Sequence, residues 1–280
     1  MKLAHLKNNK HVAQTGLVVT RPGEKIRLAD VSTRDSGGYK EKDEVQPRLE
    51  ELRDKLGDLQ ERLYAEGKQS LLIVFQAMDT GGKDGATKNI MKGANAAGVN
   101  VTSFKAPSKE ELAHDFLWRV HRAAPPKGMI GIWNRSHYED VLIVRVHNLV
   151  PEATWKTRYD DINNFEKLLV NNGVTILKFF LHISKDEQKE RLQARLDDPQ
   201  KHWKFNPGDL KERALWNNYQ EAYEDAINRC SSEVAPWLLV PADRKWARDI
   251  AVLEAVVATL ENMNPQFPQA DFDPKSIVIE

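Results

Sequence analysis

The sequence predicts an α/β protein, a three-layer αβα sandwich in which a parallel sheet of about five strands lies between helices, with a helical lid at one end. Three observations support this prediction. Short apolar runs alternate with longer segments of helical periodicity, which is the pattern of successive βαβ units. The first apolar run, residues 71–75, leads directly into a glycine-rich loop with a Gly-Lys pair. A strongly charged helical pair, residues 184–223, follows the fourth run.

The length and composition restrict the possible classes of protein. A chain of 280 residues is long enough for one large α/β domain with a substantial core. Its 41 Lys and Arg balance its 41 Asp and Glu, so it lacks the overall positive field of most nucleic-acid-binding proteins. We therefore expect no nucleic-acid partner, and a site for any other polyanion has to be local. The single cysteine, Cys230, excludes a disulfide framework and is expected to be a small buried residue on a helix.

The ends of the chain differ in composition from the predicted domain. Residues 1–45 mix charged residues with Gly and Pro, so we expect an arm that wraps the domain or pairs with a neighbouring subunit. The domain is predicted at residues 46–265, including the lid at 184–215, and residues 266–280 are a tail. The N-terminus lacks the apolar core of a signal peptide, and no apolar run approaches roughly 18 residues. These features predict a soluble, cytoplasmic protein with no membrane partner.

The periodicity of apolar residues predicts each element in turn. Leucines spaced by three and four residues indicate a helix from Pro47 that ends near Gly67. The helix after the glycine-rich loop is expected to end at Gly98, a helical stretch covers residues 109–125, and a long helix with one apolar face ends at Gly173. Apolar runs bounded by turn residues predict the strands, at residues 71–75, 99–105, 128–133, 174–183 and 237–241.

The loop after the first strand, AMDTGGKDG at residues 77–85, is similar to a phosphate-binding loop with two substitutions. The Walker A pattern begins with Gly and places Ser or Thr after its Lys, whereas this chain has Ala77 and Asp84 at these positions. Glycines allow backbone N–H groups to surround phosphate oxygens at the start of a helix, and Lys83 adds a point charge. The residues expected at the phosphates or the nucleotide are Thr80, Gly81, Gly82, Lys83, Asp84 and Gly85.

The hydroxyl that normally follows Lys83 helps to hold Mg²⁺, so another group has to carry the metal in this chain. Asp79, inside the loop, is the candidate. The alternative interpretation is an ordinary glycine-rich turn. The apolar strand before the loop and the helix after it favour a phosphate-binding loop.

A second polar segment, WNRSHYEDV at residues 133–141, follows another predicted strand. Ligands of open parallel sheets bind at the carboxyl ends of strands, so this segment faces the same crevice as the loop. Asn134 is expected to contact the phosphates or the nucleotide, and Arg135 could stabilise charge on a phosphoryl group. Glu139 could hold Mg²⁺ or its waters. Asp140 has an alternative interpretation as an acid that complements a helix dipole.

The charged segment 184–223 predicts two helices joined by a turn. Ser184 and Glu187 fit a capping box, Pro199 ends the first helix, and Asp209 can cap the second. Next to a phosphate-binding loop, such a pair resembles the mobile lid with which kinases cover phosphates and exclude water. The alternative is a solvated helix pair held by salt bridges. The basic residues expected to face the substrate are Arg191, Arg195, Lys201, Lys204 and Arg213.

The segments QAMDTGGKDGATKN, WNRSHYEDVL and RLDDPQKHWKFNPGDLKER together resemble the polyphosphate kinase 2 family, over residues 45–265. The resemblance implies a P-loop kinase fold and a Mg²⁺-dependent transfer of phosphoryl groups from inorganic polyphosphate to nucleotides, with Mn²⁺ as an alternative metal. It implies that Asp79 binds the metal, so that the missing hydroxyl is a trait of the family. Lys83 and Arg135 are implied to contact the phosphoryl group in transfer.

The same resemblance has consequences for the other site residues. Many members of the family carry Asp where this chain has Asn134, which places part of the metal role on Glu139. The basic residues Arg191, Arg195, Lys201 and Lys204 are implied to lie on the lid and the polyphosphate path. The spelling Asn-Arg-Ser-His-Tyr-Glu-Asp is most similar to the subgroup that accepts nucleoside mono- and diphosphates, here of adenine, with guanine as an alternative. The resemblance also implies a homo-oligomer, namely a tetramer.

Two other functions fit these residues. An ATP-using nucleoside or nucleotide kinase of similar fold would have a compact, ATP-shaped site instead of a long basic track. A non-catalytic sensor of nucleotides or polyanions would bind tightly without turnover, and the joint presence of Asp79, Lys83 and Arg135 argues against it. A zinc site is not expected, because the histidines show no i, i+4 pair with an intervening Glu and have no cysteine partners.

Overall fold

The computed structural model describes residues 4–279 and shows an α/β protein with a six-stranded sheet in the order β1-β6-β5-β2-β4-β3. Strands β2 to β6 pair in parallel, and β1 pairs antiparallel with β6. The predicted parallel sheet of five strands is confirmed, with a two-residue strand added at one edge. The strands are β1 (Val18–Val19), β2 (Ser70–Gln76), β3 (Val99–Ser103), β4 (Ile130–Asn134), β5 (Val174–His182) and β6 (Trp237–Pro241).

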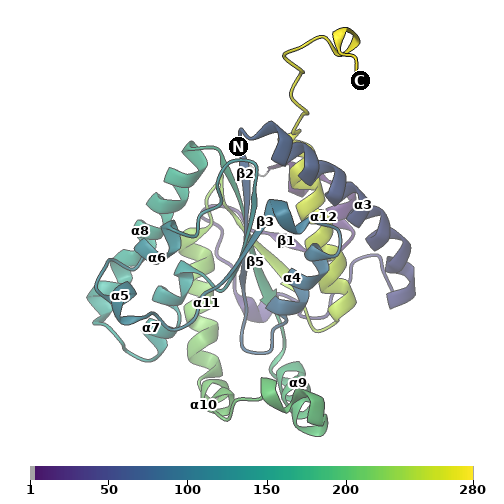
Figure 1. Cartoon of the computed structure of the whole chain (residues 1–280). Helices are drawn as coiled ribbons and strands as arrows, with labels where there is room; N and C mark the ends of the chain where they lie inside the picture. The colour runs from purple at the N-terminus through teal and green to yellow at the C-terminus, as the bar shows by residue number, and fades with distance from the viewer. Residues whose placement is uncertain (1–3, 280) are drawn as a thin grey trace.

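Helices cover both faces of this sheet, which confirms the predicted three layers. Figure 1 shows α3, α4 and α12 on one side of the strands and α8 and α11 on the other. The α-helices are α1 (Ala4–Asn8), α2 (Lys10–Ala13), α3 (Lys42–Glu66), α4 (Lys83–Met91), α5 (Lys109–Leu112), α6 (Trp118–His121), α7 (Ile143–Val146), α8 (Glu152–Asn171), α9 (Lys185–Asp197), α10 (Gly208–Ala214), α11 (Trp216–Cys230) and α12 (Lys245–Met263). The short 3-10 helices are η1 (Leu28–Asp30), η2 (Ala96–Gly98), η3 (His137–Val141), η4 (Pro199–Lys204) and η5 (Pro274–Ser276).

The side chains of β2 alternate between the two apolar layers of the core. Leu71, Ile73 and Phe75 belong to the larger apolar cluster, whereas Leu72 and Val74 belong to the smaller one on the opposite face. None of the five side chains is exposed to solvent beyond 1%. A strand that is buried on both faces has to be apolar at every position, which explains the uninterrupted run in the sequence.

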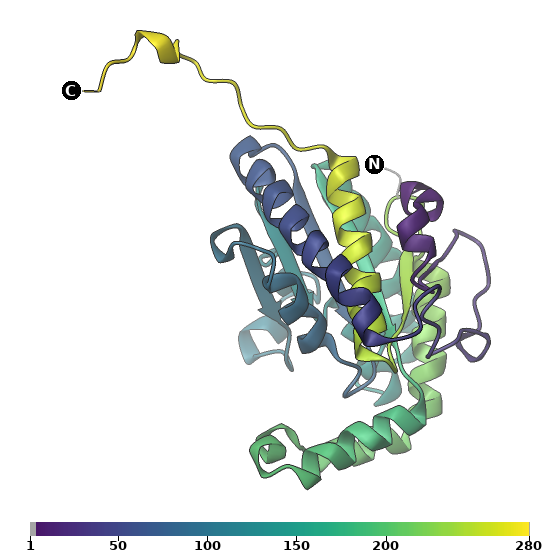
Figure 2. The ribbon, with the colours of Figure 1, turned by 90° about the vertical axis from the view of Figure 1, so that its right-hand side faces the viewer.

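The N-terminal arm packs against its own domain, which is the first of the two arrangements expected from the sequence. Leu6, Val12 and Leu28 are buried in the main core, and α1 and α2 pack against α12. The backbone N–H of Thr20 donates to Trp237 O (3.0 Å), which extends the pairing of β1 with β6. The arm is therefore part of the packed structure. The C-terminal tail instead extends away from the body in both views (Figures 1 and 2).

Three predicted helix boundaries were wrong. Helix α3 begins at Lys42 and contains Pro47; its start is fixed by the Glu44 carboxylate, which accepts the backbone N–H of Lys40 (2.7 Å). Helix α4 ends at Met91, because the chain turns at Gly93, where a Cβ atom would lie 2.7 Å from the backbone O of Arg53 in α3. The expected helical stretch at 109–125 is two short helices, α5 and α6.

The predicted lid corresponds to α9, η4 and α10, which project from the body beyond the carboxyl end of the sheet (Figure 2).

Cys230 is buried at the end of α11, as expected. Within residues 4–279, none of the helices combines the length and apolar character needed to cross a membrane.

Candidate active site

The phosphate-binding loop joins β2 to α4 and is held in an unusual backbone conformation. Gly82 has φ 99° and precedes Lys83, the first residue of α4. Thr80 has φ 63°, a value that β-branched residues rarely adopt, and such strain persists where the surroundings enforce it. The buried hydroxyl Oγ1 of Thr80 has no hydrogen-bond partner within the described part of the chain. An oxygen acceptor or a water bound in the loop would satisfy it.

Lys83 points back into the loop, where its ammonium donates to Ala77 O (3.0 Å). The hydroxyl of Tyr223, from α11, donates to the same carbonyl (2.9 Å). Burial, and then the nearby Arg135, lower the pKa of Lys83. An ammonium has three donors, so one of them fixes Lys83 in the loop and the remaining donors are suited to anionic oxygens.

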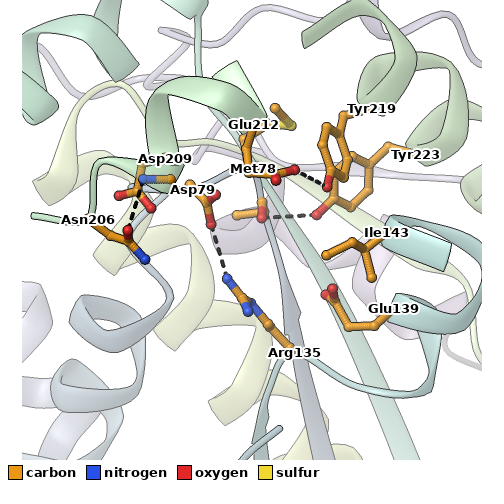
Figure 3. A pocket seen from close by; sticks show the side chains of 12 residues that line it. Met78, Asp79, Arg135, Glu139, Ile143, Asn206, Asp209, Glu212, Tyr219 and Tyr223 are labelled. Atoms are coloured by element: carbon orange, nitrogen blue, oxygen red, sulfur yellow. Dashed lines mark hydrogen bonds and ion pairs between the residues drawn. The ribbon is translucent and has the colours of Figure 1, made fainter. Parts of the chain in front are cut away.

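Arg135 follows the end of β4 and faces the loop across the sheet edge. Its backbone, with φ 63°, donates an N–H to Phe75 O (3.0 Å), and its guanidinium Nη2 lies 3.1 Å from Asp79 Oδ1 (Figure 3). Burial opposes the charged form, but Glu139 and Asp79 hold the pKa of Arg135 above its ordinary value.

Asn134, the residue before Arg135, donates from Nδ2 to the Asp84 carboxylate. Asp84 differs from the Walker A motif, and Asn134 differs from the Asp that many family members carry at the strand end. These two residues are therefore in contact with each other.

Gly81 approaches Ala77 so closely that a Cβ atom at Gly81 would overlap the Ala77 side chain.

A large cleft crosses the carboxyl end of the sheet and is rich in cations. We call it the basic cleft; its volume is about 870 Å³. It extends from the start of α12, across the phosphate-binding loop and under the lid, to the end of β3. Its lining residues are Asp79, Thr80, Gly81, Gly82, Lys83, Asp84, Gly85, Ser103, Phe104, Lys105, Asn134, Arg135, Glu187, Glu190, Arg191, Ala194, Arg195, Lys201, Lys204, Asp209, Lys245 and Arg248.

A smaller cavity of about 230 Å³ adjoins the basic cleft and contains several carboxylates (Figure 3). We call it the acidic cavity. Burial, and then the charge of Asp79, raise the pKa of Asp209. Asp79, Arg135 and Asp209 line both spaces, so the cavity and the cleft meet at these three side chains. The cavity is lined by Ala77, Met78, Asp79, Arg135, Glu139, Ile143, Asn206, Gly208, Asp209, Glu212, Tyr219 and Tyr223.

The donor groups at this junction fit a magnesium ion. In phosphoryl-transfer sites Mg²⁺ is bound by one or two carboxylates together with waters and phosphate oxygens. Asp79 and Glu139, the two acids expected from the sequence, face the same acidic cavity. Asp79 also borders the basic cleft, so its carboxylate can reach an ion placed where the cavity and the cleft meet.

The first lid helix is fastened to the phosphate-binding loop. Gln188 Nε2 donates to Asp79 O (3.0 Å), and Arg191 Nη1 donates to Thr80 O (2.9 Å). Arg191 also donates to Ala242 O (2.5 Å) and pairs with Glu187 (2.6 Å), and its side chain is only 8% exposed. Arg191 therefore lines the cleft as a fixed cation that supports the strained loop.

The outer lid residues are more exposed. Arg195 donates to Lys204 O (3.0 Å) and lies 3.3 Å from Asp209, so it ties α9 to α10. Lys201 of η4 pairs with Asp198, the residue before this 3-10 helix, at 2.7 Å. About half of the Lys201 side chain is exposed. Together with Lys204, these cations line the basic cleft.

Three expectations for the lid were wrong or incomplete. The Glu187 carboxylate does not complete a capping box, because it binds Arg191 while Asp243 accepts the backbone N–H of Ser184 (2.8 Å). Asp209 is the second residue of α10 and not its cap. Arg213 lines neither space within the described residues; it donates to Lys185 O (2.6 Å) and Gln188 Oε1 (3.0 Å).

Asp140 has a structural partner and does not face the cavity. Its carboxylate lies 2.9 Å from Arg158 of α8, and burial raises its pKa to about 6 against the effect of that guanidinium. The preceding residues, His137 and Tyr138, both contact Glu166, which pairs with Lys178 (2.7 Å). These contacts anchor the segment that carries Arg135 and Glu139.

The family model described as polyphosphate kinase 2 matches residues 39–268. The chain belongs to the polyphosphate kinase 2 family. The predicted family is confirmed, and with it the predicted P-loop kinase-like fold and the class of activity, a kinase that uses polyphosphate.

Individual members of the family resemble the chain over most of its length. The AMP/ADP-polyphosphate phosphotransferase of Meiothermus ruber is 55% identical over 229 residues, which are 82% of this chain and 86% of that protein. The ADP-polyphosphate phosphotransferase of Rhodopseudomonas palustris is 44% identical over 88% of this chain and 90% of that protein. The crystal structure of polyphosphate kinase 2 from Arthrobacter aurescens TC1 has a TM-score of 0.88 at 46% identity, and covers 91% of this chain and 92% of that chain.

The structure adds site residues that were not expected from the sequence. Arg248 in α12, 4% exposed, donates to Gly82 O (3.2 Å) and lines the basic cleft. Lys245, on the same helix, and Lys105, just after β3, line it as well. A search for cations in the few residues that follow each predicted strand would have found Lys245, whereas Lys105 falls inside the strand predicted at residues 99–105. Glu212 and Tyr219, which line the acidic cavity, carried no such signal.

Proposed function

We propose that the protein transfers phosphoryl groups from inorganic polyphosphate to AMP and to ADP, with Mg²⁺ bound where the two substrates meet. The observation that carries this proposal is the junction of the acidic cavity and the basic cleft at Asp79 and Arg135. The proposed metal ligand, Asp79, and the proposed phosphate-binding cation, Arg135, therefore both line the two spaces proposed for the substrates.

The chemistry of each space indicates its substrate. Polyphosphate is a chain of anions without apolar groups, and the basic cleft offers cations from the loop, the lid and α12. A nucleotide also carries an aromatic base, and the acidic cavity presents Ile143, Tyr219 and Tyr223 beside hydrogen-bond acceptors. The Meiothermus ruber relative is named an AMP/ADP-polyphosphate phosphotransferase. This name supports both AMP and ADP as acceptors for this chain.

The reaction needs positioning and neutralisation of charge more than proton transfer. An oxygen of the acceptor's terminal phosphate attacks the terminal phosphorus of polyphosphate. The bond from that phosphorus to its bridging oxygen breaks, and the electron pair stays on the shortened polyphosphate. The attacking oxygen is already anionic at neutral pH, so no side chain has to remove a proton.

Each proposed role follows from the contacts of the residue. Lys83 and the N–H groups of the loop bind the transferred phosphoryl group, and Arg135 donates to it from the opposite side. Asp79 and Glu139 would hold Mg²⁺, and the bound metal would supply neutralisation of the charge on the phosphate oxygens. The ion pair between Asp79 and Arg135 (3.1 Å) holds the proposed metal ligand next to the proposed phosphate-binding cation at the carboxyl end of the sheet.

The test is to incubate the purified protein with Mg²⁺, polyphosphate and either AMP or ADP, and to separate the products by ion-exchange chromatography. We expect ADP from AMP and ATP from ADP, with both products lost when EDTA removes the metal. Formation of product from ATP but not from polyphosphate would identify an ATP-using kinase. Tight binding of nucleotide without any product would identify a sensor.

A further inference from the structure

The basic cleft continues beyond the sheet into a second groove. We call this space, of about 550 Å³, the edge groove. It shares Ser103, Phe104 and Lys105 with the basic cleft, so the two are contiguous at the carboxyl end of β3, the last strand of the sheet. The edge groove is lined by Thr102, Ser103, Phe104, Lys105, Ala106, Glu111, Trp118, Arg119, Arg122 and Ala123.

Two of the three cations in the edge groove have no acidic partner. Arg119 is 8% exposed, lies 3.9 Å from Glu111 and stacks over Phe104, so its charge is used within the fold. Lys105 and Arg122 are exposed, and neither forms an ion pair within residues 4–279. The groove therefore presents two free positive charges and one acid that is already paired.

Neighbouring groups hold the backbone of Lys105 and the guanidinium of Arg122. Arg119 Nη1 donates to Lys105 O (2.8 Å), which holds the backbone of Lys105. The guanidinium of Arg122 lies 4.6 Å from the centre of the Trp118 ring, and His114 stacks on the same ring at 4.1 Å. The guanidinium of Arg122 is held before binding, so it loses less conformational entropy when it contacts an anion.

We propose that the edge groove binds phosphates of polyphosphate that lie several units from the reacting end. This inference rests on the proposed function. A chain whose terminal phosphate lies at Lys83 extends along the basic cleft, and Lys105 belongs to both spaces, so it marks the passage to Arg122. The groove thereby makes the affinity for the donor depend on its chain length.

The edge groove should affect the affinity of long polyphosphates only. A short polyphosphate occupies the cleft between the loop and the lid and does not reach Arg122. Each further unit that reaches a cation displaces its counterions, so the affinity for long chains is more sensitive to salt than the affinity for short ones. The KM of the protein should therefore fall with increasing chain length until the chain fills the edge groove.

The test is the KM for linear polyphosphates of defined length, at saturating ADP and Mg²⁺, for the wild-type protein and for Arg122→Ala, which lies in the edge groove and outside the basic cleft. The wild-type series also tests the proposed function, because it requires turnover with polyphosphate. We expect the variant to reach its lowest KM at a shorter chain length and to have a KM for long chains raised by roughly tenfold. Its KM for the shortest active donor, its KM for ADP and its kcat should stay within about twofold of wild type.

A matched control removes the same charge at the opposite end of the sheet. Arg21 is exposed and lies near the amino end of β6, so Arg21→Ala should leave the length dependence unchanged. The slope of log KM for long chains against log salt should fall by roughly 1 in the groove variant only. An equal rise in KM for short and long donors, an unchanged length dependence, or the same effect in the control would each overturn the proposal.

Discussion

Lys178 of β5 and Glu166 of α8 form a fully buried ion pair, with Nζ and Oε2 2.7 Å apart, behind the segment that carries Arg135 and Glu139. Lys178 also donates to Tyr138 OH (2.8 Å) and Cys230 O (2.6 Å). Burial would raise the pKa of Glu166, but the Lys178 ammonium and the contact with His137 together keep that pKa below its ordinary value.

We expect Lys178→Met to lower the free energy of unfolding by about 3 to 5 kcal/mol, because it leaves the Glu166 carboxylate buried without its cation. Lys178→Met/Glu166→Gln should recover at least about 2 kcal/mol of this loss, since the buried amide carries no charge and can still accept the Tyr138 hydroxyl. Urea unfolding at neutral pH measures both values. Additive losses in the double variant would contradict the interpretation of a charge-compensated pair.

The carboxylate of Asp79 is expected to be essential for turnover. Asp79→Asn preserves the shape of the side chain but removes the charge proposed to hold the metal, so kcat should fall by roughly 10²- to 10³-fold. Steady-state rates at saturating ADP and polyphosphate, measured over a range of Mg²⁺ concentrations, test this. A near-normal rate would place the metal on Glu139 instead.

Lys83→Ala should be at least as damaging as Asp79→Asn. A preorganised donor to a transition-state oxygen is worth about 3 to 4 kcal/mol, so we expect a loss in kcat of at least roughly 10²-fold. Lys88→Ala is the matched control, because Lys88 lies on the same helix α4, is exposed, and lines neither the basic cleft nor the acidic cavity. A comparable loss in Lys88→Ala would assign the effect to helix α4 in general.

The strands and the phosphate-binding loop could be predicted from the sequence because their signals are local. Residues 71–75 are apolar at every position, and the loop places Gly and Lys at fixed offsets from that strand. The two-residue strand β1 has no such signal, since only its pairing with β6 makes it a strand.

The remaining site residues depend on contacts that are distant in the sequence. Arg191 binds Thr80 O across 111 residues, and its role as a support for the loop follows from this contact and not from the spacing of the lid cations. Likewise, Lys105 and Arg248 line one cleft because β3 and β6 run in the same direction, so that their carboxyl ends lie at the same end of the sheet.

Different lid cations should affect the KM values of different substrates. Lys201→Ala/Lys204→Ala removes two cations of the basic cleft and should raise the KM for long polyphosphate by at least about tenfold, or about 1.4 kcal/mol, with little change in the KM for ADP. Arg195→Ala should raise both KM values, because Arg195 holds Asp209, which also lines the acidic cavity. Equal losses in the Lys201→Ala/Lys204→Ala variant would show that these lysines serve lid closure in general.

The last prediction concerns His182, which joins β5 to the N-terminal arm. Its ring Nε2 lies 3.1 Å from Leu28 O, and its side chain is buried. Burial lowers the pKa of His182, although the Leu28 carbonyl and the nearby Asp243 carboxylate favour the charged form. The folded protein therefore keeps this ring neutral at pH values where the unfolded chain already binds a proton.

Because the unfolded state binds more protons below a pH of about 6.5, the free energy of unfolding should fall as the pH is lowered from that value towards the lowered pKa of the folded state. The contribution of His182 to this slope is at most about 1.4 kcal/mol per pH unit. His182→Gln keeps a donor for Leu28 O but cannot titrate, so its stability should decline less steeply than that of the wild type. Urea unfolding between pH 5 and 8, at a fixed protein concentration, measures the difference, with the exposed His11→Gln as the control. Equal slopes for His182→Gln and the wild type would show that the contact of this ring with the arm does not depend on its neutral form.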